Sequence, residues 1–282
     1  MSSDNPQTFD RGNAVPFAAF VPHPPILLPE IGGSESSRVQ TTFDACEGIA
    51  RTLAEQKVGT IVMTSPHMAH VDRVPGVFGG NTFTGDLAQF RAPELRFSFE
   101  NDTDLANLIK RMADDGDVPL REIPPNQALN LDHGLTVFLY FLNRLDYRPK
   151  LCLITPAYSA YEDNFQYGGL LAAAMVEHHS SCAFVASGDL SHRLTHGAPA
   201  GYNPRGREFD DAYCNAMRGR DYESLLKLDR GLIDAAGVCG HVTMLMLLGS
   251  SLSLGLESNF VSYEGPWGVG YLVSRFEAVD VS

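Results

Sequence analysis

The stretch 14-AVPFAAFVPHPPILLPEIGG-33 decides the fold, because it shows where an apolar strand begins and where it has to stop. Residues 17–21 are apolar throughout, which is typical of a strand that is buried on both faces of a sheet. The prolines on both sides of His23 cannot donate backbone hydrogen bonds to a neighbouring strand, so the strand ends there. His23 is therefore held just past a strand end, where it suits a ligand or catalytic group and equally a histidine that only caps an element.

Strands and helices alternate along the rest of the chain, which predicts an α/β fold with a mostly parallel sheet and helices on both faces. We expect a single domain over residues 14–278, preceded by a disordered polar tail at 1–13. Two closing strands make the central sheet mixed. Further strands are expected at 58–65, 150–157, 181–188, 257–263 and 269–276, an antiparallel excursion at 74–100, and helices at 35–56, 102–114, 132–144, 164–178, 205–218, 221–228 and 239–254.

The composition of the 282 residues excludes several classes of function. A net charge of −13 argues against partners that are nucleic acids or anionic membrane surfaces. No apolar run approaches the roughly 20 residues that a membrane-spanning helix needs, and the polar start does not resemble a signal peptide. The five cysteines are scattered without a CxxC pair, which argues against a zinc ribbon or a disulfide framework. We therefore expect a soluble, acidic protein of the cytoplasm.

Histidines follow several of the expected strands at their carboxyl ends. His23 follows the first strand, His67 follows the second in 65-SPHMAH-70, and His192 follows a later one in 187-SGDLSH-192. His133 lies in 131-LDHG-134, where Asp132 is a candidate helix cap. Because ligands in open α/β sheets bind beyond the carboxyl ends of the strands, we expect these four histidines to meet at one edge.

The remaining histidines are less informative. His178 and His179 are typical of a solvated helix end. His70 has a weak metal-binding spacing to His67, and we interpret His70 as a supporting residue rather than a ligand.

A catalytic transition-metal site needs two or three imidazole, carboxylate or thiolate ligands and open positions for substrate. The sequence therefore predicts a metal site, and we expect the nearest ring nitrogens of His23 and His67 to lie within about 5 Å of each other.

Several segments together resemble a known family. Through these segments, which are given below, the chain resembles the class III extradiol dioxygenase superfamily, typified by the catalytic beta subunit of protocatechuate 4,5-dioxygenase. The resemblance covers about residues 15–276. It is also similar to the related Memo proteins. The segments, in chain order, are 21-VPHPPILLPEIG-32, 64-TSPH-67, 132-DHG-134, 187-SGDLSH-192 and 263-YEGPWGVGY-271.

This resemblance implies a site for a small aromatic substrate and O₂. It implies that His23 and His67 are metal ligands, that His192 is the acid/base group facing the substrate, and that His133 lines the pocket. In such dioxygenases a glutamate on a late segment completes the site around Fe(2+). Asp189 is expected to orient His192 or to cap the turn. The resemblance also implies a homo-oligomer or a pairing with a second subunit.

The sequence departs from this pattern at the third ligand. Valine stands at position 238, where the glutamate is expected, and the Memo branch resembles this chain in its following Cys-Gly pair. We therefore predict Cys239 as the third ligand, with His241 and Glu264 as alternatives. A thiol that opens a helix should have a lowered pKa. A thiolate would favour Zn(2+) or copper over Fe(2+).

The sequence does not favour two other kinds of site, a hydrolase triad and a phosphate-binding loop. Ser187, Asp189 and His192 are too close in sequence to favour a hydrolase triad. No glycine-rich phosphate loop is present, since 265-GPWGVG-270 is not followed by a helix.

We therefore expect the function of a ring-opening dioxygenase. The alternatives are a Memo-like metal-binding or redox protein without ring cleavage, or a noncatalytic subunit of a dioxygenase pair. Candidate aromatic residues for the floor of a pocket are Tyr158, Tyr161, Phe165, Tyr202 and Trp267.

Overall fold

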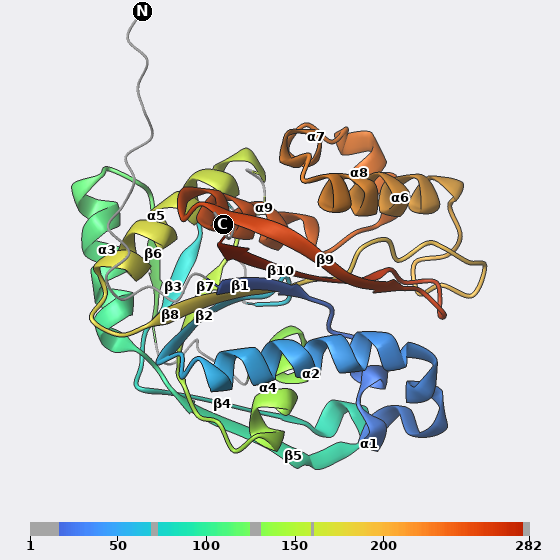
Figure 1. The fold of residues 1–282 in the computed structure, drawn as a ribbon, viewed down its shortest axis with the longest axis horizontal. Coiled ribbons are helices and arrows are strands. Elements are labelled where there is room, and N and C mark those ends of the chain that lie inside the picture. Colours follow the sequence, from blue (N-terminus) through green and yellow to red (C-terminus); the bar gives the residue numbers. More distant parts are fainter. Residues whose placement is uncertain (1–16, 69–72, 125–130, 159–160, 279–282) are drawn as a thin grey trace, which may run out of the picture.

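The computed structural model describes residues 17–68, 73–124, 131–158 and 161–278. The tail predicted at 1–13 and the interpretation of His70 both lie outside these described residues. Figure 1 shows a central sheet with helices on both of its faces. The strands are β1 (Phe17–Val21), β2 (Thr60–Thr64), β3 (Gly76–Phe78), β4 (Thr82–Leu87), β5 (Ala92–Glu100), β6 (Arg121–Ile123), β7 (Lys150–Thr155), β8 (Cys182–Ser187), β9 (Leu256–Glu264) and β10 (Tyr271–Ala278).

The helices follow the alternation that the sequence predicts. Side chains cap several of them; Asp102 accepts a hydrogen bond from the Leu105 amide, and Asp132 accepts one from the Gly134 amide. The helices are α1 (Pro29–Gly32), α2 (Gln40–Glu55), α3 (Thr103–Asp115), α4 (His133–Arg144), α5 (Tyr161–Glu177), α6 (Pro204–Gly219), α7 (Tyr222–Leu226), α8 (Arg230–Ala236) and α9 (His241–Ser253), with short 3₁₀ turns at Pro25–Leu27, Gly33–Val39 and Ala88–Phe90.

Among the described residues, eight strands form one mixed sheet in the order β6-β3-β7-β2-β8-β1-β10-β9. The central neighbours β7, β2, β8 and β1 are parallel, while β10 pairs antiparallel with both β1 and β9. This arrangement confirms the predicted α/β class with a mostly parallel sheet made mixed by its closing strands. Because β1, β8 and β2 are parallel neighbours, their carboxyl ends lie at the same edge.

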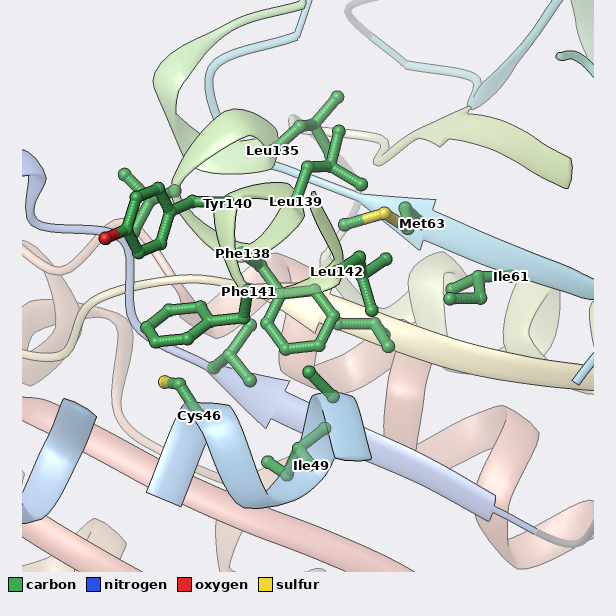
Figure 2. Packing of buried hydrophobic residues seen from close by; sticks show 14 of the residues in the cluster. Cys46, Ile49, Ile61, Met63, Leu135, Phe138, Leu139, Tyr140, Phe141 and Leu142 are labelled. Carbon is green, nitrogen blue, oxygen red and sulfur yellow. The ribbon is translucent and has the colours of Figure 1, made fainter. Parts of the chain in front are cut away.

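Side chains of the central strands alternate between two hydrophobic cores. In β1, Phe17, Ala19 and Val21 pack into the core beneath α2 and α4, whereas Ala18 and Phe20 pack into the core beneath α5 and α9. Figure 2 shows the first core, in which α4 inserts aromatic and leucine side chains between α2 and β2. Burial on both faces explains why these strands are continuous apolar runs in the sequence.

The sequence prediction was incomplete around the edge of the sheet. The excursion at 74–100 divides: β3 joins the main sheet antiparallel to β7, and β4 and β5 form a separate two-stranded sheet. The three-residue strand β6 and the seven-residue helix α8 were not predicted, and both are too short to show a clear periodicity.

Further differences concern helices. The helix expected at 35–56 begins only at residue 40, after a 3₁₀ turn. His178 is buried, with 3% of its surface exposed, so its assignment to a solvated helix end was wrong. The cause is tertiary: Asp102 approaches its ring from a distant segment, and Cys182 at the start of β8 lies against the same ring. None of the helices in the described part of the chain has the length and hydrophobicity required to traverse a lipid bilayer.

Candidate metal centre

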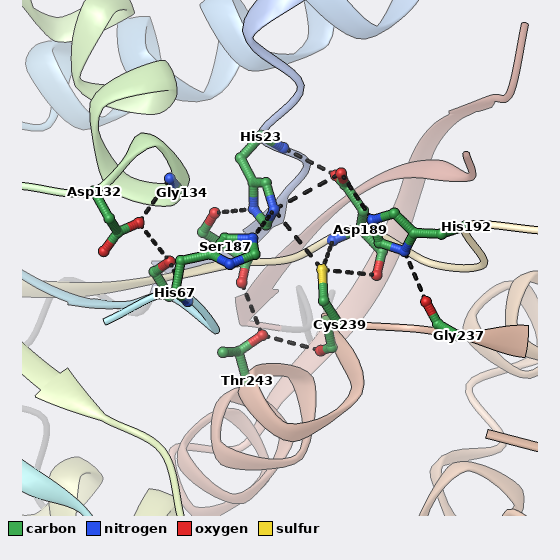
Figure 3. Close-up of polar contacts among 12 residues, drawn as sticks. His23, His67, Asp132, Gly134, Ser187, Asp189, His192, Gly237, Cys239 and Thr243 are labelled. Carbon is green, nitrogen blue, oxygen red and sulfur yellow. Dashed lines mark hydrogen bonds and ion pairs between the residues drawn. The ribbon is translucent and has the colours of Figure 1, made fainter. Parts of the chain in front are cut away.

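The segments that follow β1 and β2 bring His23 and His67 together. Their Nε2 atoms lie 3.0 Å apart, inside the limit expected from the sequence, and the Cys239 Sγ lies 3.7 Å from the Nε2 of His23. The ligand atoms of these three residues all lie within 4.8 Å of one another. In Figure 3 the three side chains converge around the central His23. Two imidazoles and a thiol in this arrangement are a donor set that a transition metal accepts.

His23 is fixed by the end of β8 and the residues directly after it. Its Nδ1 lies 2.8 Å from the Ser187 Oγ, and its backbone amide donates to the Asp189 Oδ1 at 3.0 Å. The carbonyl of Ser187 is held in turn by the Thr243 hydroxyl at 2.9 Å. Because Nδ1 is occupied, Nε2 is the nitrogen that faces His67 and Cys239. Such partners orient metal-binding imidazoles in general.

Burial keeps the imidazole of His23 neutral. Removal from water lowers the pKa of His23 well below its usual value, and the neighbouring His67, His133 and His192 lower it further. A metal ligand must be unprotonated, since a proton and a metal ion compete for the same lone pair. The buried position therefore prepares His23 for ligation.

His67 is tied to the start of α4. Its backbone amide donates to the Ser65 Oγ at 3.1 Å, and the Ser65 hydroxyl donates to the Asp132 Oδ1 at 2.9 Å. The rings of His67 and His133 are stacked with centroids 4.3 Å apart, and the His133 ring meets His23 edge-on at 5.3 Å. The Asp132 cap thus places His133 beside the two candidate ligands.

Cys239 lies just before α9 rather than within it. The helix begins at His241, so the expectation that Cys239 opens it was wrong by two residues. The pKa of the Cys239 thiol is raised, first by burial and then by the nearby Asp189, although the Asp189 amide donates to its sulfur at 3.3 Å. The lowered thiol pKa expected from a helix terminus was therefore also wrong, because desolvation outweighs the backbone contacts. A metal ion would have to displace the thiol proton.

His192 lies beside this group but is not part of it. Its Nδ1 donates to the Gly237 carbonyl at 2.8 Å, so its Nε2 carries the free lone pair, 3.9 Å from the Asp189 Oδ2. Burial lowers the pKa of His192 and raises the pKa of Asp189 to about 7. The arrangement gives a neutral imidazole that can accept a proton next to the candidate metal ligands.

The two alternative third ligands point to other partners. The Glu264 carboxylate accepts hydrogen bonds from the amide and hydroxyl of Thr42 at 2.7 and 2.6 Å, on α2. The His241 Nδ1 lies 3.4 Å from the hydroxyl of Tyr213. Neither belongs to the group of converging ligand atoms found among the described residues. Of the three candidates, the structure brings only Cys239 to His23 and His67.

The hydrolase arrangement is not formed, as expected. The Ser187 hydroxyl contacts His23 rather than His192. The candidate aromatic floor is also not assembled in one place. Tyr158 contacts the carbonyl of Pro66 beside His67, whereas Tyr202 is exposed on the surface. Tyr161 and Phe165 line a separate cavity with His241, and Trp267 packs beside Arg38 and Tyr271.

Sequence reasoning missed the roles of several residues that shape the centre. Ser187 and Thr243 hold His23, and Ser65 links His67 to Asp132. Phe90 approaches the His133 ring edge-on with centroids 5.6 Å apart. The serines at the carboxyl ends of β8 and β2 were a usable signal, since each stands at the same edge as the histidines. Nothing in the sequence near Phe90 or Thr243 indicates their position.

Comparisons with known proteins identify relatives of this chain. Residues 17–274 match the model of the LigB family, described as the catalytic LigB subunit of aromatic ring-opening dioxygenase. The chain is 32% identical over 266 residues to Protein CA_C1420 of Clostridium acetobutylicum, covering 92% of this chain and 56% of that protein. This chain therefore spans little more than half the length of that relative.

Two further matches are more distant. The chain is 27% identical over 208 residues to 3,4-dihydroxyphenylacetate 2,3-dioxygenase of Escherichia coli, covering 68% of this chain and 72% of that enzyme. The solved structure of uncharacterized protein JW3007 from Escherichia coli K12 shares the fold with a TM-score of 0.65 at 18% identity, over 92% of this chain and 98% of that one. The family match spans nearly all of the described chain, and the resemblance read from the histidine motifs is confirmed. The chain belongs to the LigB family, within the class III extradiol dioxygenase superfamily.

Proposed function

We propose that the protein is a metal-dependent extradiol dioxygenase that opens the ring of a catechol- or aminophenol-like compound with O₂. The observation that carries this proposal is the convergence of His23, His67 and Cys239 next to the neutral His192. Membership of the LigB family supports the class of reaction. The relative named as a 3,4-dihydroxyphenylacetate dioxygenase supports a catechol-like substrate.

The residues present fit a metal ion. His23 and His67 offer facing Nε2 atoms, and the Ser187 hydroxyl holds the His23 ring in the required orientation. When bound, Fe(2+) would supply coordination positions for the substrate oxygens and for O₂. The sulfur of Cys239 also suits Zn(2+) or copper, which makes the identity of the ion a central measurement.

The chain itself supplies the proton transfer. The His192 Nε2 has the lone pair that can take a proton from a substrate hydroxyl, because the Nδ1 proton is committed to the Gly237 carbonyl. Asp189, 3.9 Å from that nitrogen, is placed to stabilise the protonated ring. The ring of His133 lies beside His67 and that of Phe90 lies beside His133, so both are suited to position an aromatic ring.

The test begins with anaerobic purification and metal analysis, followed by a panel of catechols and aminophenols under O₂. We expect O₂ uptake and a product whose mass equals that of the substrate plus one O₂. His192→Ala should retain bound metal and lose turnover by at least about 100-fold, the size typical of a general acid/base. His179→Ala, which changes an exposed histidine, is the control. Loss of metal together with activity would show that His192 is a ligand instead.

A second candidate function is favoured by the thiol at the third position. A Memo-like protein that binds metal without cleaving rings would use the same three residues, with Cys239 selecting a softer ion. Metal binding without turnover on the whole panel would support this candidate. Absence of both metal binding and turnover would favour a noncatalytic subunit.

Assembly and location complete the proposal. We infer that the chain works as a homo-oligomer or paired with a second subunit, and that it acts in the cytoplasm. Light scattering of the purified chain gives its mass in solution. Purification from the native source under mild salt would reveal a second subunit.

A further inference from the structure

A cavity lies on the side of the sheet that α5 and α9 cover. It has a volume of about 220 Å³ and is bounded by α5, α9 and the segment that runs from α7 into α8. None of the converging metal-ligand residues lines it. Its walls are largely apolar, formed by Phe165, Leu228, Ile233 and Leu245.

One buried polar side chain lines this cavity. His241 is 4% exposed, and its Nδ1 lies 3.4 Å from the hydroxyl of Tyr213. The Tyr213 hydroxyl is fully buried and has no other hydrogen-bond partner among the described residues, so we assign it as the donor to Nδ1, the only arrangement in which its proton is satisfied. The ring proton of His241 is then on Nε2, which has no hydrogen-bond partner among the described residues. The cavity thus contains a donor that only a ligand or water can satisfy.

The two charged residues that line the cavity, Glu162 and Arg230, neutralise each other. Arg230 makes two hydrogen bonds to the Glu162 carboxylate, at 2.9 and 3.0 Å, and stacks over the Tyr161 ring at 5.1 Å. Leu226, which is 39% exposed, adds an apolar side chain to the same lining. A charged ligand would lose its hydration here without gaining a free counter-ion.

We propose that this cavity binds a small uncharged aromatic molecule with one hydrogen-bond acceptor, a carbonyl or hydroxyl oxygen that receives the Nε2 proton of His241. An apolar cavity of about 150 Å³ holds benzene, so a volume of about 220 Å³ has room for one substituted ring. Tyr161 and Phe165 offer ring faces and edges for contact with it. The proposal does not depend on ring cleavage, because the cavity contains no candidate metal ligand of the centre described above.

The test uses benzamide as the probe and the full chain after treatment with a chelator, so that the metal centre cannot hold the probe. Isothermal titration and ligand-detected NMR should show saturable binding to one site. Benzoate should bind at least about tenfold more weakly, because its charge must be buried without a partner. Equal binding of benzoate and benzamide would contradict the proposed neutral pocket.

Three substitutions locate the probe. His241→Leu should weaken benzamide at least about fivefold and leave toluene, which has no acceptor, unchanged. Ile233→Trp should fill the cavity and abolish binding of both probes. Leu226→Trp obstructs the mouth from an exposed position, so it tests the cavity even if a buried variant fails to fold. His179→Leu is the control, and circular dichroism checks each fold.

The outcomes are decisive in both directions. Weakened binding in Leu226→Trp, together with an effect of His241→Leu that is confined to benzamide, supports the proposal. Absence of saturable binding to the unmodified chain overturns it. Binding that survives Leu226→Trp and Ile233→Trp would place the probe elsewhere and would overturn it equally.

Discussion

The two ends of the central sheet each hold a histidine, an aspartate and a cysteine, yet only one end has the geometry of a metal centre. At the amino ends of β2 and β8, the His178 Nε2 lies 3.4 Å from the Asp102 Oδ1, and its Nδ1 lies 3.5 Å from the Cys182 Sγ. The two ring nitrogens thus face different partners. Asp102 is occupied further by the Thr60 hydroxyl and by the first turn of α3.

At the carboxyl ends of the same strands, the partners converge instead. The Nε2 of His23 faces both the Nε2 of His67 and the sulfur of Cys239, at 3.0 and 3.7 Å. His67 is exposed and Cys239 is partly exposed, whereas His178, Asp102 and Cys182 are all buried. The comparison shows that convergence of donor atoms on one accessible point, rather than residue type, distinguishes the candidate metal centre from the buried network at the other end.

The largest effect that separates the two ends is the response of metal binding to loss of an imidazole. His67→Ala should lower metal affinity by more than about 100-fold, because loss of a supporting residue alone costs about 10–100-fold. His178→Ala should leave the metal content unchanged. It should instead lower the free energy of unfolding by about 1–3 kcal/mol, because the buried Asp102 would lose one of its partners and keep only Thr60 and the Leu105 amide.

Metal titration and urea unfolding of both variants check this pair of expectations. His179→Ala, beside His178 but exposed, is the matched control for the helix end. Loss of metal in His178→Ala would mean that the two ends are coupled and that the comparison is misleading.

The sequence predicted one of these ends much better than the other. Prolines, serines and histidines directly after apolar strands are local signals, and parallel pairing of β1, β8 and β2 carries them to one edge. At the opposite end, His178 meets Asp102 from a loop 76 positions earlier in the chain, and no local pattern reveals that contact. Its burial was therefore missed.

Cys239 shows the same limit in its chemistry. The Cys-Gly pair and the adjacent apolar helix are visible in the sequence, and they correctly led to a residue that meets His23. The raised pKa of the Cys239 thiol depends first on burial and then on the charge of Asp189, which follows β8. Both effects exist only once the chain has folded. The proximity of Cys239 to His23 could be predicted from the sequence, whereas the direction of the shift in its thiol pKa could not.

An intermediate effect is expected when the two cysteines are compared. Cys239→Ser should weaken metal binding at least about tenfold, because a serine hydroxyl is a far poorer ligand than a thiolate. Cys182→Ser should leave it unchanged, and so should Glu264→Gln, whose carboxylate is bonded to Thr42. Competition with a chromogenic chelator measures all three. Weakening by Glu264→Gln alone would restore a carboxylate ligand and exclude the thiol.

The smallest expected effect is a change in stability in acid, and it arises from the buried network of His178, Asp102 and Cys182. Burial by itself raises the pKa of Asp102, but hydrogen bonds from Thr60 and Leu105 and the field of His178 outweigh it, so the pKa is lowered overall. The unfolded chain then binds more protons in acid than the folded chain does. The stabilisation is complete above the unfolded pKa of about 4 and is lost as the pH falls through the folded pKa.

Asp102→Asn, which preserves the helix cap, should therefore be less stable than the unmodified chain at pH 7 and should lose less stability on acidification. Urea unfolding of metal-free protein between about pH 7 and pH 2 gives the two slopes whose sign the linkage relation fixes. Asp114→Asn, an exposed position on the same helix, should follow the unmodified chain. Parallel slopes for Asp102→Asn and the unmodified chain would show that the buried carboxylate does not titrate differently on folding. The contrast between a closed network and an accessible centre would then rest on geometry alone.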